Sequence, residues 1–332
     1  MSKRGVLISL VVAAMGGSVV HGQATIHVPA DAQTIQIAIQ QAQPFDTILV
    51  APGTYFEAIN YMGKVIVIQS SSPNDPATVA NTIIDAGGLG IVVTFAGTEG
   101  DVHTALDGFT ITGGTTGVDG NRTLAAIRNC IIRDNSLYGI DEVDGDITNC
   151  EVLSNSAGIV SCHGTISLCF VEDNNGAGMS DCDGFLTECV VTRNAGIGVQ
   201  SCDGQVERCL ISNNESHGVQ SSNASFKQCI ISGNVGNGLR SCRGTLIENS
   251  LIAGNRNHGF ESCSLGVLNC TLIGNAGWGF VNHTGAIKHA IIWTNTAGAL
   301  HNSTTPILSG TANPFFVQPG HLDVINNVWI DG

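Results

Sequence analysis

Residues 149–159 read NCEVLSNSAGI, and variants of this stretch recur along the chain as far as residue 295. Each variant contains an Asn that returns at intervals of roughly 20 residues, a spacing typical of repeat architectures. Chance does not produce such a series, so the chain is built from tandem structural units. The recurring residues are Asn135, Asn155, Asn174, Asn194, Asn214, Asn234, Asn255, Asn275 and Asn295.

The residues around the recurring Asn predict three short strands and three turns in each unit. An apolar residue stands three positions before the Asn in every unit, and a Cys stands five positions before it in most units. Side chains two positions apart on a strand point to the same face, so we expect both to face inward. Asn and Gly tolerate left-handed backbone, so we expect the recurring Asn and the Gly after it at the turns.

A single unit of this length cannot bury its own inner face, but units stacked about 4.8 Å apart can. The sequence therefore predicts an all-β parallel solenoid with an internal ladder of Asn side chains. Leucine-rich repeats have similar periods and are the main alternative. Their remaining half-turn carries leucines, whereas here it carries two Gly, a Cys or Ser and a β-branched strand, which favours the β-solenoid.

Residues 1–24 have the features of a secretory signal peptide. Lys3 and Arg4 precede an apolar run over residues 6–20, and Gly22 and Ala24 offer small residues for cleavage after Ala24. A membrane anchor is the alternative, but the run is shorter than the roughly 20 residues of a membrane span. We expect an exported protein that is extracellular, periplasmic or at the cell surface, with no membrane span in the mature chain.

Composition excludes several classes of protein. The chain has 332 residues, of which 43% are hydrophobic and 12% charged, so it is neither disordered nor a coiled coil. Its net charge of −14 disfavours nucleic acid and anionic membranes as partners. The same charge favours cations or neutral glycans as ligands.

The flanks of the repeat array complete the predicted organisation. Residues 33–42 place Ile35, Ala38 and Ile39 on one helical face, which predicts an N-terminal helix that caps the core. We divide the mature chain into this helix with irregular coils (25–120), regular coils (121–298) and a closing segment (299–332). Strands are expected within the irregular part at residues 47–50, 65–68, 82–85 and 91–95.

The twelve Cys residues fall into two columns of the repeat. Ser222 and Ser250 each replace a Cys in one column while the Cys of the other column is kept. True disulfide partners would tend to be lost together, and a buried thiol behaves as a small hydrophobic group. This favours stacked buried thiols, with disulfides between neighbouring units as the alternative. The columns are Cys130, Cys150, Cys169, Cys189, Cys209, Cys229 and Cys270, and Cys162, Cys182, Cys202, Cys242 and Cys263.

Acidic side chains supply the candidate catalytic and metal-binding residues. Asp183 and Asp203 share a column, so their carboxylates should stack, and two close carboxylates can perform acid–base chemistry. With Asp181 they could instead hold Ca²⁺, the one cofactor that the residues suggest. Glu207 is a third catalytic candidate, in a column where Lys227 and Glu248 alternate in charge. A solvated acidic ridge and a cross-strand charge ladder are the plainer interpretations.

Two further columns are candidates for binding. Three positions after the recurring Asn stand Tyr138, His217, His258 and Trp278, side chains that suit contact with sugars. Four positions before the Asn is an outward column that is mostly apolar, which suggests self-association, a glycan surface or cover by Phe315, Phe316 and Trp329. That column, here called the apolar stripe, comprises Ile131, Phe170, Val190, Leu210, Ile230, Leu251 and Ile291.

Residues 24–60 (ATIHVPADAQTIQIAIQQAQPFDTILVAPGTYFEAIN) resemble the opening of right-handed parallel β-helix proteins of the pectate-lyase-like superfamily. The NCEVLSNSAGI units are similar to the regular coils of that family. The resemblance implies a right-handed helix, and relatives that cut, de-esterify, epimerise or bind polysaccharides. The motifs Gly-His-Gly with Arg-Ile-Lys, and Asp-Pro-His-Asp, which mark enzymes of the family, do not occur in this sequence.

Two functional classes therefore remain open. The absent motifs favour an exported, non-catalytic module that binds polysaccharide or a protein partner along its side. A polysaccharide lyase, hydrolase or epimerase with divergent catalytic residues is the alternative.

Overall fold

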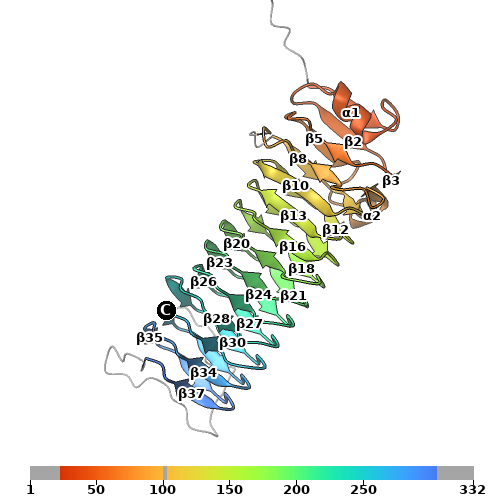
Figure 1. Cartoon of the computed structure of the whole chain (residues 1–332). Helices are drawn as coiled ribbons and strands as arrows, with labels where there is room; N and C mark the ends of the chain where they lie inside the picture. Colours follow the sequence, from red (N-terminus) through yellow and green to blue (C-terminus); the bar gives the residue numbers. More distant parts are fainter. Residues whose placement is uncertain (1–22, 100–102, 305–332) are drawn as a thin grey trace, which may run out of the picture.

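The computed structural model describes residues 23–99 and 103–304, which form an elongated solenoid of stacked coils (Figure 1). Each regular coil contributes one strand to each of three parallel sheets. The predicted parallel β-helix is confirmed, and the three-sheet coil excludes a leucine-rich repeat. Most of the predicted signal peptide and of the closing segment lies outside the described residues. Within the described part, no helix is long and apolar enough to cross a membrane.

Sheet A has 13 strands, which follow one another in sequence order along the solenoid. Its strands are β1 (Thr25–Val28), β2 (Thr47–Val50), β5 (Val67–Ser70), β8 (Ala105–Asp107), β11 (Ala126–Arg128), β14 (Ile147–Thr148), β17 (Ile166–Ser167), β20 (Phe185–Thr187), β23 (Gln205–Glu207), β26 (Ser225–Lys227), β29 (Leu246–Glu248), β32 (Gly266–Leu268) and β35 (Ile287–Lys288).

Sheet B has 12 strands and carries the apolar residues that precede the ladder Asn. Its strands are β3 (Gly53–Tyr55), β6 (Thr82–Asp85), β9 (Thr110–Thr112), β12 (Ile131–Arg133), β15 (Glu151–Leu153), β18 (Phe170–Glu172), β21 (Val190–Thr192), β24 (Leu210–Ser212), β27 (Ile230–Ser232), β30 (Leu251–Ala253), β33 (Thr271–Ile273) and β36 (Ile291–Trp293).

Sheet C has 12 strands and follows the Asn in each coil. Its strands are β4 (Ile59–Asn60), β7 (Val93–Thr94), β10 (Thr116–Thr123), β13 (Tyr138–Val143), β16 (Ala157–Val160), β19 (Met179–Ser180), β22 (Val199–Gln200), β25 (Val219–Gln220), β28 (Leu239–Arg240), β31 (Phe260–Glu261), β34 (Trp278–Val281) and β37 (Gly298–His301). Pairing with β34 continues through β37, so the coil geometry extends past residue 298.

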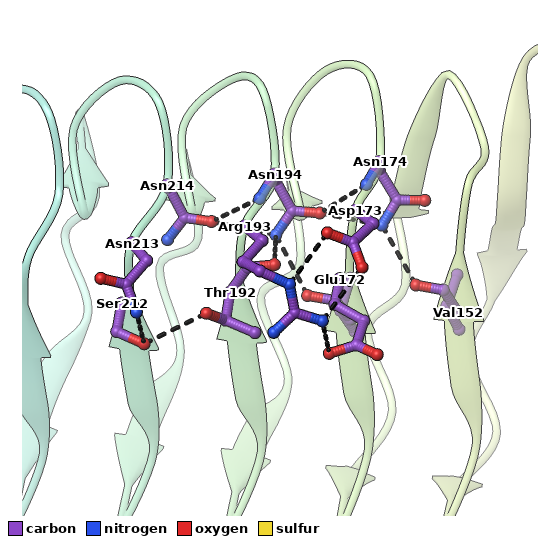
Figure 2. Close-up of polar contacts among 11 residues, drawn as sticks. Val152, Glu172, Asp173, Asn174, Thr192, Arg193, Asn194, Ser212, Asn213 and Asn214 are labelled. Atoms are coloured by element: carbon purple, nitrogen blue, oxygen red, sulfur yellow. Dashed lines mark hydrogen bonds and ion pairs between the residues drawn. The ribbon is translucent and has the colours of Figure 1, made fainter.

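The Asn ladder lies inside the corner between sheets B and C (Figure 2). The Oδ1 atom of Asn214 accepts hydrogen bonds from the backbone N–H and the Nδ2 of Asn194, at 3.1 and 3.0 Å. Asn194 Nδ2 also donates to the Val171 carbonyl at 3.0 Å. The same backbone contact joins each neighbouring pair from Asn135 to Asn295, so the predicted ladder is confirmed.

A column of Gly on sheet C makes room for this ladder. A Cβ atom on Gly198 would lie 2.7 Å from Asn214 Nδ2 and 2.7 Å from Ile211 Cγ2. Any larger residue would therefore displace the ladder or the core beside it. The repeated Gly after each Asn is a packing requirement of the fold rather than a turn.

The predicted left-handed turns at the ladder Asn and at that Gly are wrong. The residue before the Asn has the positive φ instead, as in Arg193 (φ 54°) and Asp173 (φ 54°). The Asn side chain must point inward to bond its neighbours, so the reversal of the chain falls on the preceding residue. Arg193 points outward and binds both Asp173 oxygens at 3.0 Å and Glu172 at 2.7 Å, which joins two coils (Figure 2).

The two Cys columns face the core, as predicted. All twelve Cys are thiols with at most 3% of their surface exposed. In one column the backbone N–H of Cys182 donates to the Cys202 sulfur at 3.3 Å, so the columns form a second kind of ladder. His283 follows Cys263 in that column, one coil later, and its side chain is fully buried.

Helix α1 (Ile35–Gln41) lies at the N-terminal end of the solenoid, where a helix was predicted (Figure 1). Thr34 is its N-cap, since the side chain accepts from the Ile37 N–H. Ile35, Ala38 and Ile39 are buried against the core. A second helix, α2 (Pro76–Asn81), was not predicted; it begins after Asp75, with Pro76 in its first turn.

Candidate functional site

The C-terminal half of sheet C carries a hydrogen-bonded column on its outer surface. His217 Nδ1 accepts from the backbone N–H of Asn237 at 2.9 Å, and His258 Nδ1 accepts from that of Trp278 at 2.9 Å. Between them, Asn237 Oδ1 accepts from the His258 N–H at 2.9 Å. The structure thus brings three of the four predicted sugar-contacting residues into one continuous column.

Each ring of this column lies over a Gly of the following coil. A Cβ atom on Gly236 would lie 2.4 Å from His217 Nδ1, and one on Gly277 would lie 2.2 Å from His258 Nδ1. A Cβ on Gly298 would lie 2.5 Å from the Trp278 ring. The Nδ1–Cε1 edge of each imidazole and the ring of Trp278 therefore lie close to the backbone of the next coil, and all three side chains stay partly exposed.

A second column of sheet C supplies lateral partners. Arg240 Nη1 lies 3.1 Å from His217 Nε2, Asn237 Nδ2 donates to Glu261 Oε2 at 2.7 Å, and the Trp278 and His301 rings stack at 5.1 Å. Arg240 Nε is 3.3 Å from the same Glu261 oxygen. We call this surface the His–Trp face; it comprises His217, Asn237, Arg240, His258, Glu261, Trp278, Val281 and His301.

The pKa values of His217 and His258 are both lowered from the ordinary value of His. Burial lowers the pKa of His217, the Arg240 charge lowers it further, and Glu261 acts in the opposite direction. Burial also lowers the pKa of His258, against the effect of Glu261. Because Nδ1 accepts a hydrogen bond in both residues, the proton of each neutral ring is on Nε2.

Tyr138 is separate from the His–Trp face. It lies on β13, and β16, β19 and β22 stand between it and the coil of His217. Its surroundings are acidic: Asp119 and Asp141 are paired in register on β10 and β13. Burial, with the charges of Glu142 and Asp119, raises the pKa of Asp141 to about 6. Asp119 was not singled out from the sequence.

Asp183 and Asp203 lie in successive coils and are joined through the backbone of Asp203. Asp183 Oδ1 accepts from the backbone N–H of Asp203 at 3.0 Å, and Asp203 accepts from the N–H and Nδ2 of Asn223 at 2.9 and 3.0 Å. These exposed carboxylates thus bond the next coil. Over residues 23–99 and 103–304, no group of three or more His, Cys, Asp or Glu is placed to hold a metal ion. The calcium site at Asp181, Asp183 and Asp203 stays a prediction.

Glu207 lies in a charge ladder on the outer face of sheet A. It pairs in register with Lys227, whose Nζ is 3.8 Å from Glu248 Oε1. Arg208 binds Glu207, and its Nε is 3.0 Å from Glu188 Oε1. Glu207 is thus paired with Arg208 of its own coil, and the ion pairs Arg208–Glu188 and Lys227–Glu248 join successive coils.

A cleft near the N-terminal end of sheet A contains candidate functional residues that were not predicted from the sequence. It has a volume of about 420 Å³ and is lined by Gln69, His103, Asp107 and Arg128, with Phe45 at its side. Half-burial raises the pKa of Asp107, although a 2.7 Å hydrogen bond from Asn129 and the charge of Arg128 oppose this. Asp107 occupies the same column of sheet A as Glu207. Following that column back from the regular repeats into the irregular coils leads to it.

The apolar stripe lies on the outer face of sheet B, as predicted. Phe170, Val190, Leu210 and Ile230 are paired in register on successive strands. Phe170 and Ile230 expose 48% and 43% of their surface. The tail residues Phe315, Phe316 and Trp329, which were considered as its cover, lie outside the described residues.

Solved structures resemble this chain at low sequence identity. The A-module of the mannuronan C-5 epimerase AlgE6 of Azotobacter vinelandii has a TM-score of 0.56 and 15% identity, over 82% of this chain and 95% of that module. An alginate lyase of Paenibacillus sp. FPU-7 gives 0.43 and 13%, over 85% and 99%. Pectate lyase Pel9A gives 0.37 and 13%, over 85% and 80%. The first of these likenesses shows a shared fold.

No curated protein shows significant sequence similarity to this chain. The family model for the right-handed β-helix region matches residues 118–240 and 186–312, which together make up more than half of the chain. The three parallel sheets, the Asn ladder and this match agree. The chain belongs to the right-handed β-helix family.

Proposed function

We propose that this protein is an extracytoplasmic β-helix module that binds polysaccharide along its His–Trp face. The observation that carries the proposal is the column His217, Asn237, His258 and Trp278, in which each coil fixes the side chain of the coil before it. Imidazole rings already fixed by a backbone hydrogen bond lose little conformational freedom when a ligand binds. Aromatic surface with polar edges suits the apolar faces and hydroxyl groups of sugars.

The direction of the column supports a polymeric ligand. The residues repeat once per coil, about 4.8 Å apart, along the solenoid axis. A glycan chain laid along this axis meets the partly exposed rings of His217, His258 and Trp278, with the buried Asn237 between the first two. Multiple weak contacts of this kind add up to useful affinity because they are linked in one chain.

Affinity electrophoresis against a panel of neutral and acidic polysaccharides tests the proposal. Trp278→Ala and His258→Ala should lose retardation by the polysaccharide that retards the wild type. Tyr138→Ala is the matched control, because Tyr138 lies on the same sheet but outside the His–Trp face. Equal retardation of all four proteins would refute the assignment of the site, and no retardation by any polymer of the panel would refute the proposed ligand class.

A specific observation favours a second candidate function, polysaccharide-degrading or -modifying activity in the sheet A cleft. Asp107 is half-buried beside Arg128, and a carboxyl group with a raised pKa suits general acid–base catalysis. Chain length and uronate composition of the same polysaccharides should be measured after incubation with and without Ca²⁺. Activity that Asp107→Asn abolishes, and that Asp183→Asn, Asp203→Asn and Glu207→Gln keep, would assign catalysis to the cleft.

A further inference from the structure

His217 and Arg240 present two hydrogen-bond donors to each other. The backbone N–H of Asn237 donates to His217 Nδ1 at 2.9 Å, so Nδ1 carries the lone pair and Nε2 carries the proton of the neutral ring. Arg240 Nη1 lies 3.1 Å from that Nε2. A guanidinium has donors and no acceptor, so this short contact is not a hydrogen bond in the neutral tautomer.

Arg240 is held in this position from its other side. Its Nε is 3.3 Å from Glu261 Oε2, and that oxygen also accepts from Asn237 Nδ2 at 2.7 Å. Asn237 is fully buried, and its own N–H is the donor that fixes His217. One residue therefore positions both donors: Asn237 orients the imidazole directly and the guanidinium through Glu261.

We propose that the His217–Arg240 pair is a binding site for an oxyanion of the carboxylate or sulfate type. One oxygen of such a group accepts a hydrogen bond from the His217 Nε2–H, and another accepts from the Arg240 guanidinium. Both donors then have an acceptor. Arg is suited to this geometry because its donors form a planar fork. The inference deepens the proposed function, since a ligand bound along the His–Trp face would carry this group at the position of His217.

The chain contains an internal control for this site. His258 is held in the same way as His217, because its Nδ1 accepts a hydrogen bond from the Trp278 N–H and its ring lies against Gly277. The strand register pairs Arg240 with Glu261 and Glu261 with Val281, so Val281 stands in the coil after His258 where Arg240 stands in the coil after His217. The two imidazoles therefore differ in their lateral partner, and only His217 should respond to anions.

Nuclear magnetic resonance of protein labelled with ¹⁵N-histidine tests the proposal directly. Sodium acetate and sodium sulfate are titrated at constant ionic strength, and the two ring signals are assigned with His217→Gln and His258→Gln. We expect a saturable shift of the His217 Nε2 signal and no saturable shift at His258. Arg240→Gln should weaken anion binding by about tenfold or more, as for a lost charge-assisted hydrogen bond, with the His217 tautomer unchanged.

Several outcomes would overturn the site. Equal, non-saturating shifts at both rings would mean that no anion binds at the His217–Arg240 pair. A saturable shift that persists in Arg240→Gln would place the anion elsewhere. Unfolding curves of Arg240→Gln should match the wild type, and Arg240→Lys, which keeps the charge without the fork, provides a second variant with intermediate affinity.

A comparison of charged and neutral saccharides then shows whether the bound anionic group belongs to a glycan or is a free ion. A uronate oligosaccharide and a sulfated one are compared with their neutral counterparts at the same ring signals. Tighter binding of a charged oligosaccharide than of acetate or sulfate assigns the group to a glycan, and equal binding assigns it to a free ion. If acetate or sulfate binds and no glycan of the panel binds, the anion site is upheld and the proposed polysaccharide-binding function is refuted. If a glycan binds without a response at His217, the proposed function is upheld and the anion site is refuted.

Discussion

The Nδ1 atom of His258 accepts a hydrogen bond of 2.9 Å from the backbone N–H of Trp278, one coil further along the solenoid. This bond turns a surface side chain into part of the inter-coil framework. It also fixes the tautomer, so the Nε2–H of His258 points away from the coil that holds it. The same relationship joins His217 to Asn237. Orientation of the His–Trp face is thus set by the backbone of the fold.

Gly277→Ala should disable this face while the core stays intact. The added Cβ would lie 2.2 Å from His258 Nδ1, so the imidazole must move out of its hydrogen-bonded position. We expect polysaccharide affinity to fall about as much as in His258→Ala, and the denaturation midpoint to change little. Gly274→Ala is less suitable as a control, because Gly274 has φ +65°; Ala276→Ser, in the same turn, is preferable. Unchanged polysaccharide affinity in Gly277→Ala would show that the hydrogen-bonded position of His258 is not needed for binding.

Asn214→Ala should destabilise the central coils by about 2 to 4 kcal/mol. The buried backbone N–H of Asn194 loses its acceptor, its Nδ2 loses one of its acceptors, and a cavity opens inside the corner. Urea unfolding followed by circular dichroism measures the effect. Asn213→Gly is the matched control, since Asn213 is exposed with φ 53° and Gly233 occupies the same position one coil later. A ladder that contributes nothing would give the two variants equal midpoints.

His283 should make the C-terminal coils sensitive to acid. Burial lowers its pKa to about 4, and neither ring nitrogen has a hydrogen-bond partner in the described structure. The unfolded chain, with an ordinary His pKa near 6.5, takes up the proton first. Stability is therefore complete above about pH 6.5 and is lost as the pH falls towards 4, by about 3 kcal/mol.

The control for this prediction is His283→Ser, because Ser222 occupies the same column. The quantity to compare is the difference in unfolding free energy between wild type and variant at each pH. Asp141, whose pKa is raised to about 6, makes a contribution of opposite sign over this range, and it cancels in that difference. A difference independent of pH between 4 and 7 would contradict the titration of His283.

The Cys columns predict that thiol reactivity differs sharply between the native and the unfolded protein. All twelve thiols are buried, and burial, with contacts between stacked sulfurs, raises the pKa of several; that of Cys229 and of Cys270 rises to about 12. Thiolate is the reactive form, so we expect almost no reaction with a chromogenic disulfide reagent at pH 8. In guanidinium chloride all twelve should react. Fewer than twelve in protein purified without reductant would reveal disulfides between coils.

The apolar stripe gives a prediction about association. Phe170 and Ile230 are exposed on the outer face of sheet B, with β21 and β24 between their strands, and an apolar column of this length favours contact with a second apolar surface. We expect the wild type to form dimers or larger species at high concentration in sedimentation velocity. Phe170→Lys with Ile230→Lys should remain monomeric. Identical profiles for both proteins would remove the stripe as an interface.

The core was predictable because it repeats. Inward positions such as Asn194 and Cys189 keep their identity from coil to coil, since each packs on its own equivalent above and below. The left-handed corner at Arg193 was not predictable from the same alignment, because this residue points outward and its column accepts Ser, Asp, Arg, Asn, Gly or Thr. Constant spacing therefore revealed the ladder but misplaced the turn beside it.

The candidate site was only partly predictable. The repeat aligns His217 with His258, but it does not show that Arg240 lies beside His217, because these residues belong to different coils and different columns. Asp107 was missed for a related reason. It lies before the regular array, where coils of unequal length hide the column that it shares with Arg128.

Units of slightly unequal length fit the same register, as the uninterrupted Asn ladder shows. Each unit bonds only its two neighbours, so a gene duplication or deletion of one whole unit would leave both new junctions complementary. Such an event would lengthen or shorten the molecule by a single step of the solenoid. Evolution could in this way change the reach of the His–Trp face without redesigning the interior.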